Sequence, residues 1–174
     1  MKTKLFTVSP RLFDPAMLSE PAEIIRRGGL VAFPTETVYG LGANALDGAA
    51  SGRIFDAKGR PHDNPQIVHV SDPGDCGKYS YCEAYPSFFK IAERFMPGPV
   101  TVITPKKDAI PDEVTVGLDT VAIRCPAHPV ARELIRLAGV PVAAPSANRS
   151  GKPSPTTAEH VLRDMDGRID AVIE

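Results

Sequence analysis

The 174-residue sequence contains no tryptophan, few cysteines and almost no excess of charge, and each scarcity excludes a class of protein. The three cysteines, Cys76, Cys82 and Cys125, are too few and too irregularly spaced for a disulfide scaffold or a zinc site. A formal net charge of −1 gives no reason to expect a dedicated nucleic-acid binder, although it permits a local basic patch. The small number and irregular spacing of the cysteines favour a reducing compartment.

Long hydrophobic runs are also missing. No stretch approaches the roughly 20 apolar residues that span a bilayer, and residues 1–4 do not lead into the apolar core of a signal peptide. We therefore expect a soluble, cytoplasmic protein with no membrane contact. Prolines and glycines are plentiful instead, at 18 and 14, and they flank short apolar runs, which is typical of short strands joined by shaped loops.

Apolar runs alternate with helical patterns along the chain, which predicts one α/β domain with a twisted mixed sheet flanked by helices. Strands are predicted at 5–8, 30–33, 67–70, 100–104, 120–124, 140–144 and 169–173. Helices are predicted at 20–27, 49–57, 87–95, 129–138 and 157–164. The connection between the strands at 100–104 and 120–124 has no helical pattern, so we expect antiparallel pairing beside the parallel pairs.

The segment 34–42, Pro-Thr-Glu-Thr-Val-Tyr-Gly-Leu-Gly, is predicted to be a loop at the end of a buried strand, where α/β sheets bind ligands. Its hydroxyls and its aromatic ring suit a ligand. An ordinary turn with glycines at unusual backbone angles fits equally well. It is not a Walker loop, because no Gly-Lys-Ser/Thr follows.

Lys58 and Arg60 are predicted to lie in a loop after a helix, two residues apart, where they could clamp separate oxygens of a polyphosphate. Pro61 and Pro65 would stiffen that loop. The alternative, two solvated surface cations, is the commoner situation.

Two single residues on strands are further candidates. Strand alternation places His69 on the face opposite Val68 and Val70, as a ligand-binding or an ordinary strand histidine. Arg124 ends an apolar strand, where it could accept a carboxylate or phosphate or form a plain surface ion pair.

The segment 144–154 combines three serines, an asparagine, an arginine and a lysine after a strand. Such groups suit phosphate and ribose, and a solvated loop has the same composition. No Ser-His-Asp order stands out, which favours a site that works by orientation and charge neutralisation. His62, His128 and His160 have no partner at ligand spacing, so we predict no protein-built metal centre.

In combination, these motifs resemble the YrdC-type threonylcarbamoyl-AMP synthase family over nearly the whole chain. The matching pieces, in order, are PTETVYGLG at 34–42, KGRP at 58–61, NP at 64–65, IVHV at 67–70, PGPVT at 97–101, GLDTVAIR at 117–124, PAHP at 126–129 and APSAN at 144–148. Each piece is short, and their order and spacing make the match specific. Lys58, Arg60, Ser146 and Asn148 look like the family's signature tetrad.

The resemblance implies a YrdC-like α/β fold with a positively charged concave face. It implies a nucleotidyltransferase that joins L-threonine, bicarbonate or CO2, and ATP into threonylcarbamoyl-AMP and pyrophosphate, with Mg²⁺ accompanying the nucleotide. The product would pass to the machinery that forms threonylcarbamoyladenosine in tRNA, and a weak RNA contact is a further expectation.

The resemblance also implies residue roles. Arg124 would hold the threonine carboxylate, with Thr35, His69 and the Ala144 backbone nearby. Lys58 and Arg60 are the expected catalytic cations, Lys58 by neutralising phosphate charge. The residues expected to bind ATP are Lys58, Arg60, Asn64, Thr120, Ser146, Asn148 and Ser154.

Family members usually continue beyond the position of Glu174 with a Gly-Val-Glu-Ser-Thr strand, an Arg-Pro-Gly segment and, in longer members, a second domain. We therefore expect residues 1–174 to be a YrdC-like domain that is truncated at its C-terminal end. Two other functions stay open: a related carbamoyl-adenylate-forming enzyme, as in a domain of the hydrogenase-maturation carbamoyltransferase, and a non-catalytic RNA-binding module.

Overall fold

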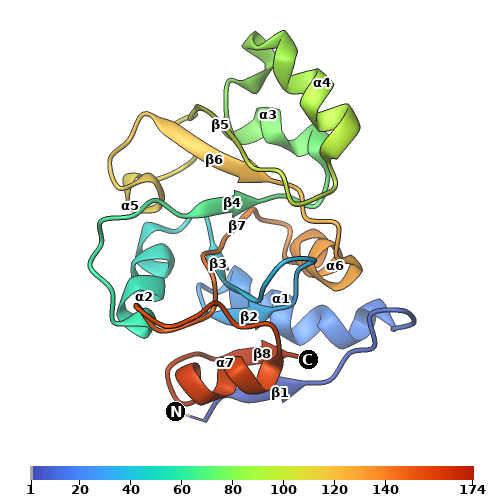
Figure 1. The fold of residues 1–174 in the computed structure, drawn as a ribbon, viewed down its shortest axis with the longest axis vertical. Helices are drawn as coiled ribbons and strands as arrows, with labels where there is room; N and C mark the ends of the chain where they lie inside the picture. The colour runs from blue at the N-terminus through green and yellow to red at the C-terminus, as the bar shows by residue number, and fades with distance from the viewer. Residues whose placement is uncertain (1) are drawn as a thin grey trace.

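The computed structural model describes residues 2–174, and these form an eight-stranded sheet in the order β1-β8-β2-β3-β7-β4-β6-β5 (Figure 1). The strands are β1 (Lys4–Phe6), β2 (Val31–Phe33), β3 (Gly40–Asn44), β4 (Ile67–His69), β5 (Val102–Pro105), β6 (Thr120–Arg124), β7 (Val142–Ala143) and β8 (Ala171–Ile173). The helices are α1 (Ser19–Arg26), α2 (Gly48–Lys58), α3 (Cys76–Tyr79), α4 (Pro86–Phe95), α5 (Asp112–Thr115), α6 (Pro129–Ala138) and α7 (Ala158–Met165), with 3-10 turns at Pro15–Leu18, Pro73–Asp75 and Cys82–Ala84.

The sheet is mixed, which confirms the predicted fold class. β8 lies between β1 and β2 and runs parallel to both, and β4 runs parallel to β6. The pairs β2–β3, β3–β7, β4–β7 and β5–β6 are antiparallel. The predicted antiparallel pairing across the connection without a helical pattern is therefore found in β5–β6.

Helices cover both faces of the sheet, because successive strand residues point to opposite sides. Val31 and Phe33 pack in a core with α1 and α6, whereas Ala32, between them, packs in a second core with α2 and α7. A third core joins β4 and β6 to α3 and α4 at the far end of the sheet (Figure 1). The loops that follow the middle strands lie between these cores.

The prediction that the whole segment 34–42 is a loop was wrong at its end. Gly40, Leu41 and Gly42 already belong to β3 and pair with β2 in a hairpin. A Cβ atom on Gly42 would lie 2.7 Å from Phe33 Cε1 and 2.8 Å from Val142 Cγ1. The glycine therefore allows close packing within the sheet, a use that sequence alone does not distinguish from a turn.

The predicted end of one helix also needs correction. Lys58 is the last residue of α2, and the loop begins at Gly59, whose left-handed backbone (φ 60°) caps the helix. On α4, Phe88 and Ala92 are buried, whereas Phe95 is 47% exposed because it lies at the helix end, beyond the core. No helix within residues 2–174 is long and apolar enough to cross a bilayer.

Candidate active site

The segments singled out in the sequence meet through a chain of hydrogen bonds in the middle of the sheet. The N–H of Tyr39, after the 34–38 loop, donates to Pro155 O (2.8 Å), and Ala147 N–H donates to Tyr39 O (2.9 Å). Lys58 Nζ in turn donates to the carbonyls of Ser146 and Asn148, about 90 residues away in sequence (|i−j| of 88 and 90). Three separate stretches of sequence therefore meet in the fold.

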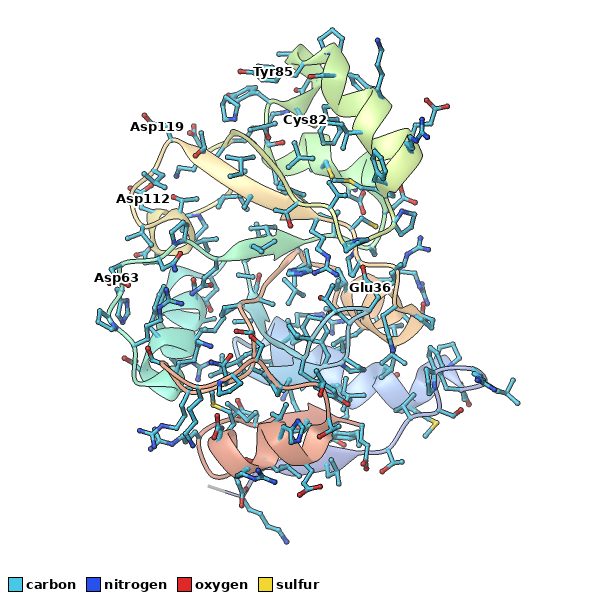
Figure 2. The ribbon with its side chains drawn as sticks, in the orientation of Figure 1. Glu36, Asp63, Cys82, Tyr85, Asp112 and Asp119 are labelled. Atoms are coloured by element: carbon cyan, nitrogen blue, oxygen red, sulfur yellow. The ribbon has the colours of Figure 1, made fainter. Side chains whose placement is uncertain are left out.

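Most of the predicted site residues fall into two groups of side chains. We call the first the Arg124 cluster, which consists of Thr35, Glu36, Thr37, His69 and Arg124. We call the second the Lys58 cluster, which consists of Lys58, Arg60, Asn64, Ser146 and Asn148. Figure 2 shows the separation between them: Glu36 lies beside α6, and Asp63, next to Asn64, lies on the other side of the molecule beyond α2.

Arg124 is buried, with 8% of its surface exposed, so the alternative of a plain surface ion pair was wrong. Its Nη2 forms an ion pair with Glu36 Oε1 at 2.7 Å, and Nε donates to Gly98 O at 3.2 Å. Nη1 and Nη2 both lie 3.3 Å from Thr37 Oγ1. The guanidinium thus already holds a carboxylate, one supplied by the protein.

Glu36 accepts a second hydrogen bond, from Ala127 N–H at 3.1 Å. Burial alone would raise the pKa of Glu36, but the hydrogen bonds from Arg124 and Ala127 outweigh it and hold that pKa below its usual value. The carboxylate is therefore charged at neutral pH and remains a partner for Arg124.

The 34–38 loop also binds to itself. Thr35 Oγ1 donates to Val38 O (2.6 Å) and accepts from Thr37 N–H (3.2 Å). The Thr35 hydroxyl, a predicted ligand, is thus used inside the loop. Glu36 and Thr37 are the exposed residues of this loop, although the Glu36 side chain itself is only 23% exposed, and their polar contacts to Arg124 and Ala127 hold the tip.

His69 is buried at the end of β4, paired in register with Arg124 of β6. Its Nδ1 lies 3.1 Å from Ile67 O, and its ring packs edge-on to Phe33. Burial, and then the charge of Arg124, lower the pKa of His69 to about 4. The imidazole is therefore neutral at pH 7 and adds no positive charge beside the guanidinium.

Lys58 is 3% exposed, so the alternative of a solvated surface cation was wrong for this residue. Burial and the neighbouring Arg60 lower the pKa of Lys58 to about 8, against the opposing effect of Asp164. The ammonium is still charged at neutral pH, and two of its three N–H groups donate hydrogen bonds to Ser146 O and Asn148 O. Lys58 thus ties the end of α2 to the 146–148 loop.

Asn148 reinforces the same loop from within. Its Nδ2 donates to the carbonyls of Arg149 (2.8 Å) and Lys152 (2.7 Å), and the residue is 8% exposed. Its Oδ1 is buried and has no hydrogen-bond partner among the described residues. Ser146 and Asn148 therefore contribute backbone carbonyls that accept from Lys58, and the Asn148 side chain cross-links the loop through its own hydrogen bonds.

The other predicted residues of this end have side chains that face solvent more freely. Arg60 is 27% exposed and lies 3.8 Å from Asp63 (Nε to Oδ1), while Asn64 and Ser154 are exposed and Ser146 and Thr120 are half-buried. Thr120 shares a strand face with Arg124, four residues along β6. A cavity of about 380 Å³ beside Ser154 is lined by residues 152–156 and by His160, Arg163 and Asp164.

The sequence did not reveal which residues form hydrogen bonds and ion pairs with the predicted site residues. Glu36 and Thr37 lie within a motif that the sequence did single out, but their contact with Arg124 could not be predicted from it. Asp164 of α7 accepts from Arg149 N–H (3.2 Å) and Lys152 Nζ (2.7 Å), and it fixes the 149–152 turn. The local pattern around Asp164 carries no signal for this role.

The Ala144 amide and two of the cysteine thiols are engaged within the fold. The Ala144 N–H donates to Ile67 O (2.9 Å) within the sheet. The thiols of Cys76 and Cys125 are buried, which raises their pKa values to about 12 and about 11 and makes them poor nucleophiles. Within residues 2–174, no three His, Cys, Asp or Glu side chains are grouped as metal ligands.

Comparison with known proteins gives a consistent result. The Sua5/YciO/YrdC family model, described as telomere recombination, matches residues 23–174. Proteins named threonylcarbamoyl-AMP synthase from Pyrococcus abyssi and Bacillus subtilis are 54% and 52% identical over 88% and 92% of this chain. The chain spans 45% and 46% of these relatives, about half of their length.

Solved structures show the same likeness. Pyrococcus abyssi Sua5 complexed with L-threonine is 49% identical and has a TM-score of 0.95, over 99% of this chain and 50% of that one. Escherichia coli YciO, at 22% identity, has a TM-score of 0.88 over 98% of this chain and 83% of that one, which shows a shared fold.

Proposed function

Because the chain belongs to the Sua5/YciO/YrdC family, we propose that it forms L-threonylcarbamoyl-AMP from L-threonine, bicarbonate or CO2, and ATP, with release of pyrophosphate. Two relatives named for this synthase activity, at more than 50% identity, support the proposal, as does the L-threonine complex of the Pyrococcus abyssi protein. The product would serve threonylcarbamoyladenosine formation in tRNA. These relatives are about twice as long, so the activity of this chain by itself is part of the proposal.

The observation that carries this proposal is the junction at Lys58. Its ammonium ties the α2 end to the 146–148 loop, and Tyr39 ties that loop to the Arg124 cluster. A guanidinium that holds a carboxylate is thereby linked, through hydrogen bonds and the short chain segments between them, to a loop region rich in hydroxyls and cations. Such a pairing suits a reaction between an amino acid and a nucleotide.

Each end would then have its own task. Arg124 would hold the threonine carboxylate, with Thr35, His69 and the Ala144 backbone around it. Arg60 would offset charge on the nucleotide phosphates, and the remaining ATP contacts would come from Asn64, Thr120, Ser146, Asn148 and Ser154. Lys58 would act on the phosphates directly, with its third proton, or by holding the loop that contacts them.

The chemistry requires two steps. The neutral threonine amine adds to CO2, which forms an N–C bond and releases a proton to give a carbamate. A carbamate oxygen then attacks the α-phosphorus of ATP in line, an O–P bond forms, and the bond to pyrophosphate breaks with its electron pair leaving on pyrophosphate. Because carbamates revert readily in water, the site must hold the carbamate beside the α-phosphate.

Magnesium would enter as part of the substrate, MgATP. Mg²⁺ usually keeps several waters and binds nucleotide phosphates with few protein ligands. The contribution of this chain would be the orientation of both substrates and the charge of Arg60 and Lys58.

The test is mass-spectrometric detection of threonylcarbamoyl-AMP from ATP, L-threonine and bicarbonate, on this chain and on Arg60→Ala. We expect the variant to fold normally, because Arg60 is partly exposed and weakly paired, and to lose about 100-fold or more of the rate. Arg53→Ala, an exposed arginine on α2, is the matched control. An unchanged rate in Arg60→Ala would remove Arg60 from the site, and pyrophosphate release without threonine would favour a different carbamoyl-adenylate enzyme.

A further inference from the structure

The side chains predicted to bind the amino acid all form hydrogen bonds or ion pairs with other groups of the protein. The Thr35 hydroxyl bonds within its loop, His69 Nδ1 lies against Ile67 O, and Arg124 bonds to Gly98, Thr37 and Glu36. A substrate can bind here only by exchange with one of these partners. The question is which partner gives way.

The geometry of Arg124 answers this question. A guanidinium offers a carboxylate two bidentate edges, Nη1 with Nη2 and Nε with Nη2. Thr37 Oγ1 lies against the first edge, 3.3 Å from both nitrogens. Gly98 O and Glu36 Oε1 occupy the second, at 3.2 Å from Nε and 2.7 Å from Nη2. Neither edge can take a second carboxylate unless Thr37 or Glu36 moves.

Glu36 and Thr37 are the partners that can move. Both lie at the exposed tip of the 34–38 loop, whose ends are fixed by β2 on one side and by Tyr39 on the other. The tip touches the rest of the protein through Arg124 and Ala127 N–H. Gly98, in contrast, is buried, and its N–H bonds to Cys125 O at 2.8 Å.

We propose that Glu36 is an internal substitute for the substrate carboxylate: it occupies Arg124 in the empty site, and the α-carboxylate of the amino acid displaces it together with Thr37. This proposal rests on the proposed function for the identity of the amino acid. The exchange replaces one carboxylate by another, so Arg124 is never buried without a counter-charge, a state that is strongly unfavourable. The apparent affinity for the amino acid is therefore the intrinsic affinity multiplied by the fraction of molecules in which the tip is open.

The first experiment compares binding of L-threonine to the wild-type chain and to Glu36→Gln by calorimetry. The substitution removes the competing charge with little change of shape, so we expect affinity for threonine to increase about 10-fold. Affinity for ATP should not change. Glu36→Asp, which keeps the charge but is one methylene shorter, should tighten threonine binding to a lesser extent, and Glu23→Gln on α1 is the matched control that should change nothing.

A second measurement reports the exchange directly. The amide of Ala127 donates a hydrogen bond to Glu36, so its NMR signal should shift when threonine is added to the wild-type chain, towards the position that it has in unliganded Glu36→Ala, which offers no acceptor. Weaker threonine binding in Glu36→Gln would overturn the proposal, because it would make Glu36 a ligand of the substrate.

The same titration with L-serine, L-alanine and acetate separates this proposal from the proposed function. If threonine fails to bind but another carboxylate binds Glu36→Gln more tightly than the wild-type chain, the displacement of Glu36 is supported and the assignment of threonine as the substrate is wrong. If threonylcarbamoyl-AMP forms while no carboxylate prefers Glu36→Gln, the function stands and the exchange is wrong. Thr37→Val, which removes only the hydroxyl from the first edge, should increase affinity by about 2-fold to 3-fold.

Discussion

The Arg124 cluster and the Lys58 cluster are linked through the hydrogen bond from Ala147 N–H to Tyr39 O, yet they are held in opposite ways. In the Arg124 cluster, side chains bond to one another, and Glu36, Thr37 and Arg124 use up the groups that would bind a ligand. In the Lys58 cluster, a side chain bonds to backbone carbonyls, which leaves the side chains of Arg60 and Asn64 towards solvent.

The difference indicates two ways of preparing a site. The Lys58 cluster is formed in advance, so a ligand there gains contacts without breaking protein hydrogen bonds. The side chains of the Arg124 cluster are already hydrogen-bonded to one another, so a ligand there must replace existing hydrogen bonds. Its binding free energy is then only the difference between the new and the replaced contacts. Selectivity is therefore expected to be greater for the amino acid, because only a group that matches the displaced carboxylate recovers the lost contacts.

The strongest test of this comparison is Lys58→Met, which removes the ammonium and keeps most of the length of the side chain. The carbonyls of Ser146 and Asn148 then lose their donor, and we expect binding of ATP to weaken by about 100-fold, which corresponds to about 2.7 kcal/mol. Calorimetry with ATP and with AMP separates two roles. Equal losses mean that Lys58 positions the loop, and a loss confined to ATP means that it touches the outer phosphates. Lys90→Met on α4 is the exposed control.

A smaller effect is expected at the other cluster, from the pKa of His69. Because this pKa is about 4 in the folded protein against 6.5 unfolded, the unfolded chain binds a proton first as the pH falls. The stability contributed by the neutral imidazole is complete above pH 6.5 and is lost between pH 6.5 and 4, by about 2 kcal/mol at pH 5.

Chemical denaturation across this range, on the wild-type chain and on His69→Gln, measures the effect. The variant should lack this part of the pH dependence. Glu36 does not confuse the result, because its lowered pKa places its own loss of stability below pH 4.5. Parallel pH curves for the two proteins would show that His69 is not held neutral.

The smallest expected effect concerns Asp164→Asn. The carboxylate is held charged by Lys152, whose hydrogen bond lowers its pKa, and it also accepts from Arg149 N–H. The amide keeps one acceptor and loses the charge, so nucleotide binding should weaken about 5-fold, or about 1 kcal/mol, with threonine binding unchanged. Asp166→Asn, on an exposed neighbour, is the control. Equal weakening of both ligands would mean that the two clusters are not independent.

Much of the fold could be predicted from the chain because periodicity and termination signals are local. The helix at Pro129–Ala138 and the strand at Thr120–Arg124 were predicted to the residue, since proline begins the former and Gly139 ends it in a left-handed conformation. The Thr157 hydroxyl accepts from His160 N–H, as expected of an N-cap. The errors at Gly40–Gly42 and Lys58 arose where a residue serves distant packing.

The sequence by itself determined the family, the α/β class and the three stretches proposed to carry the chemistry, because order, spacing and hydrophobic period are properties of the chain. Only the tertiary structure decided which groups oppose one another: that Glu36 and Thr37 fill both edges of Arg124, and that Lys58 is buried against two carbonyls. The physical reason is that burial and pairing arise from segments about 90 residues apart, and no local pattern records what lies across the fold.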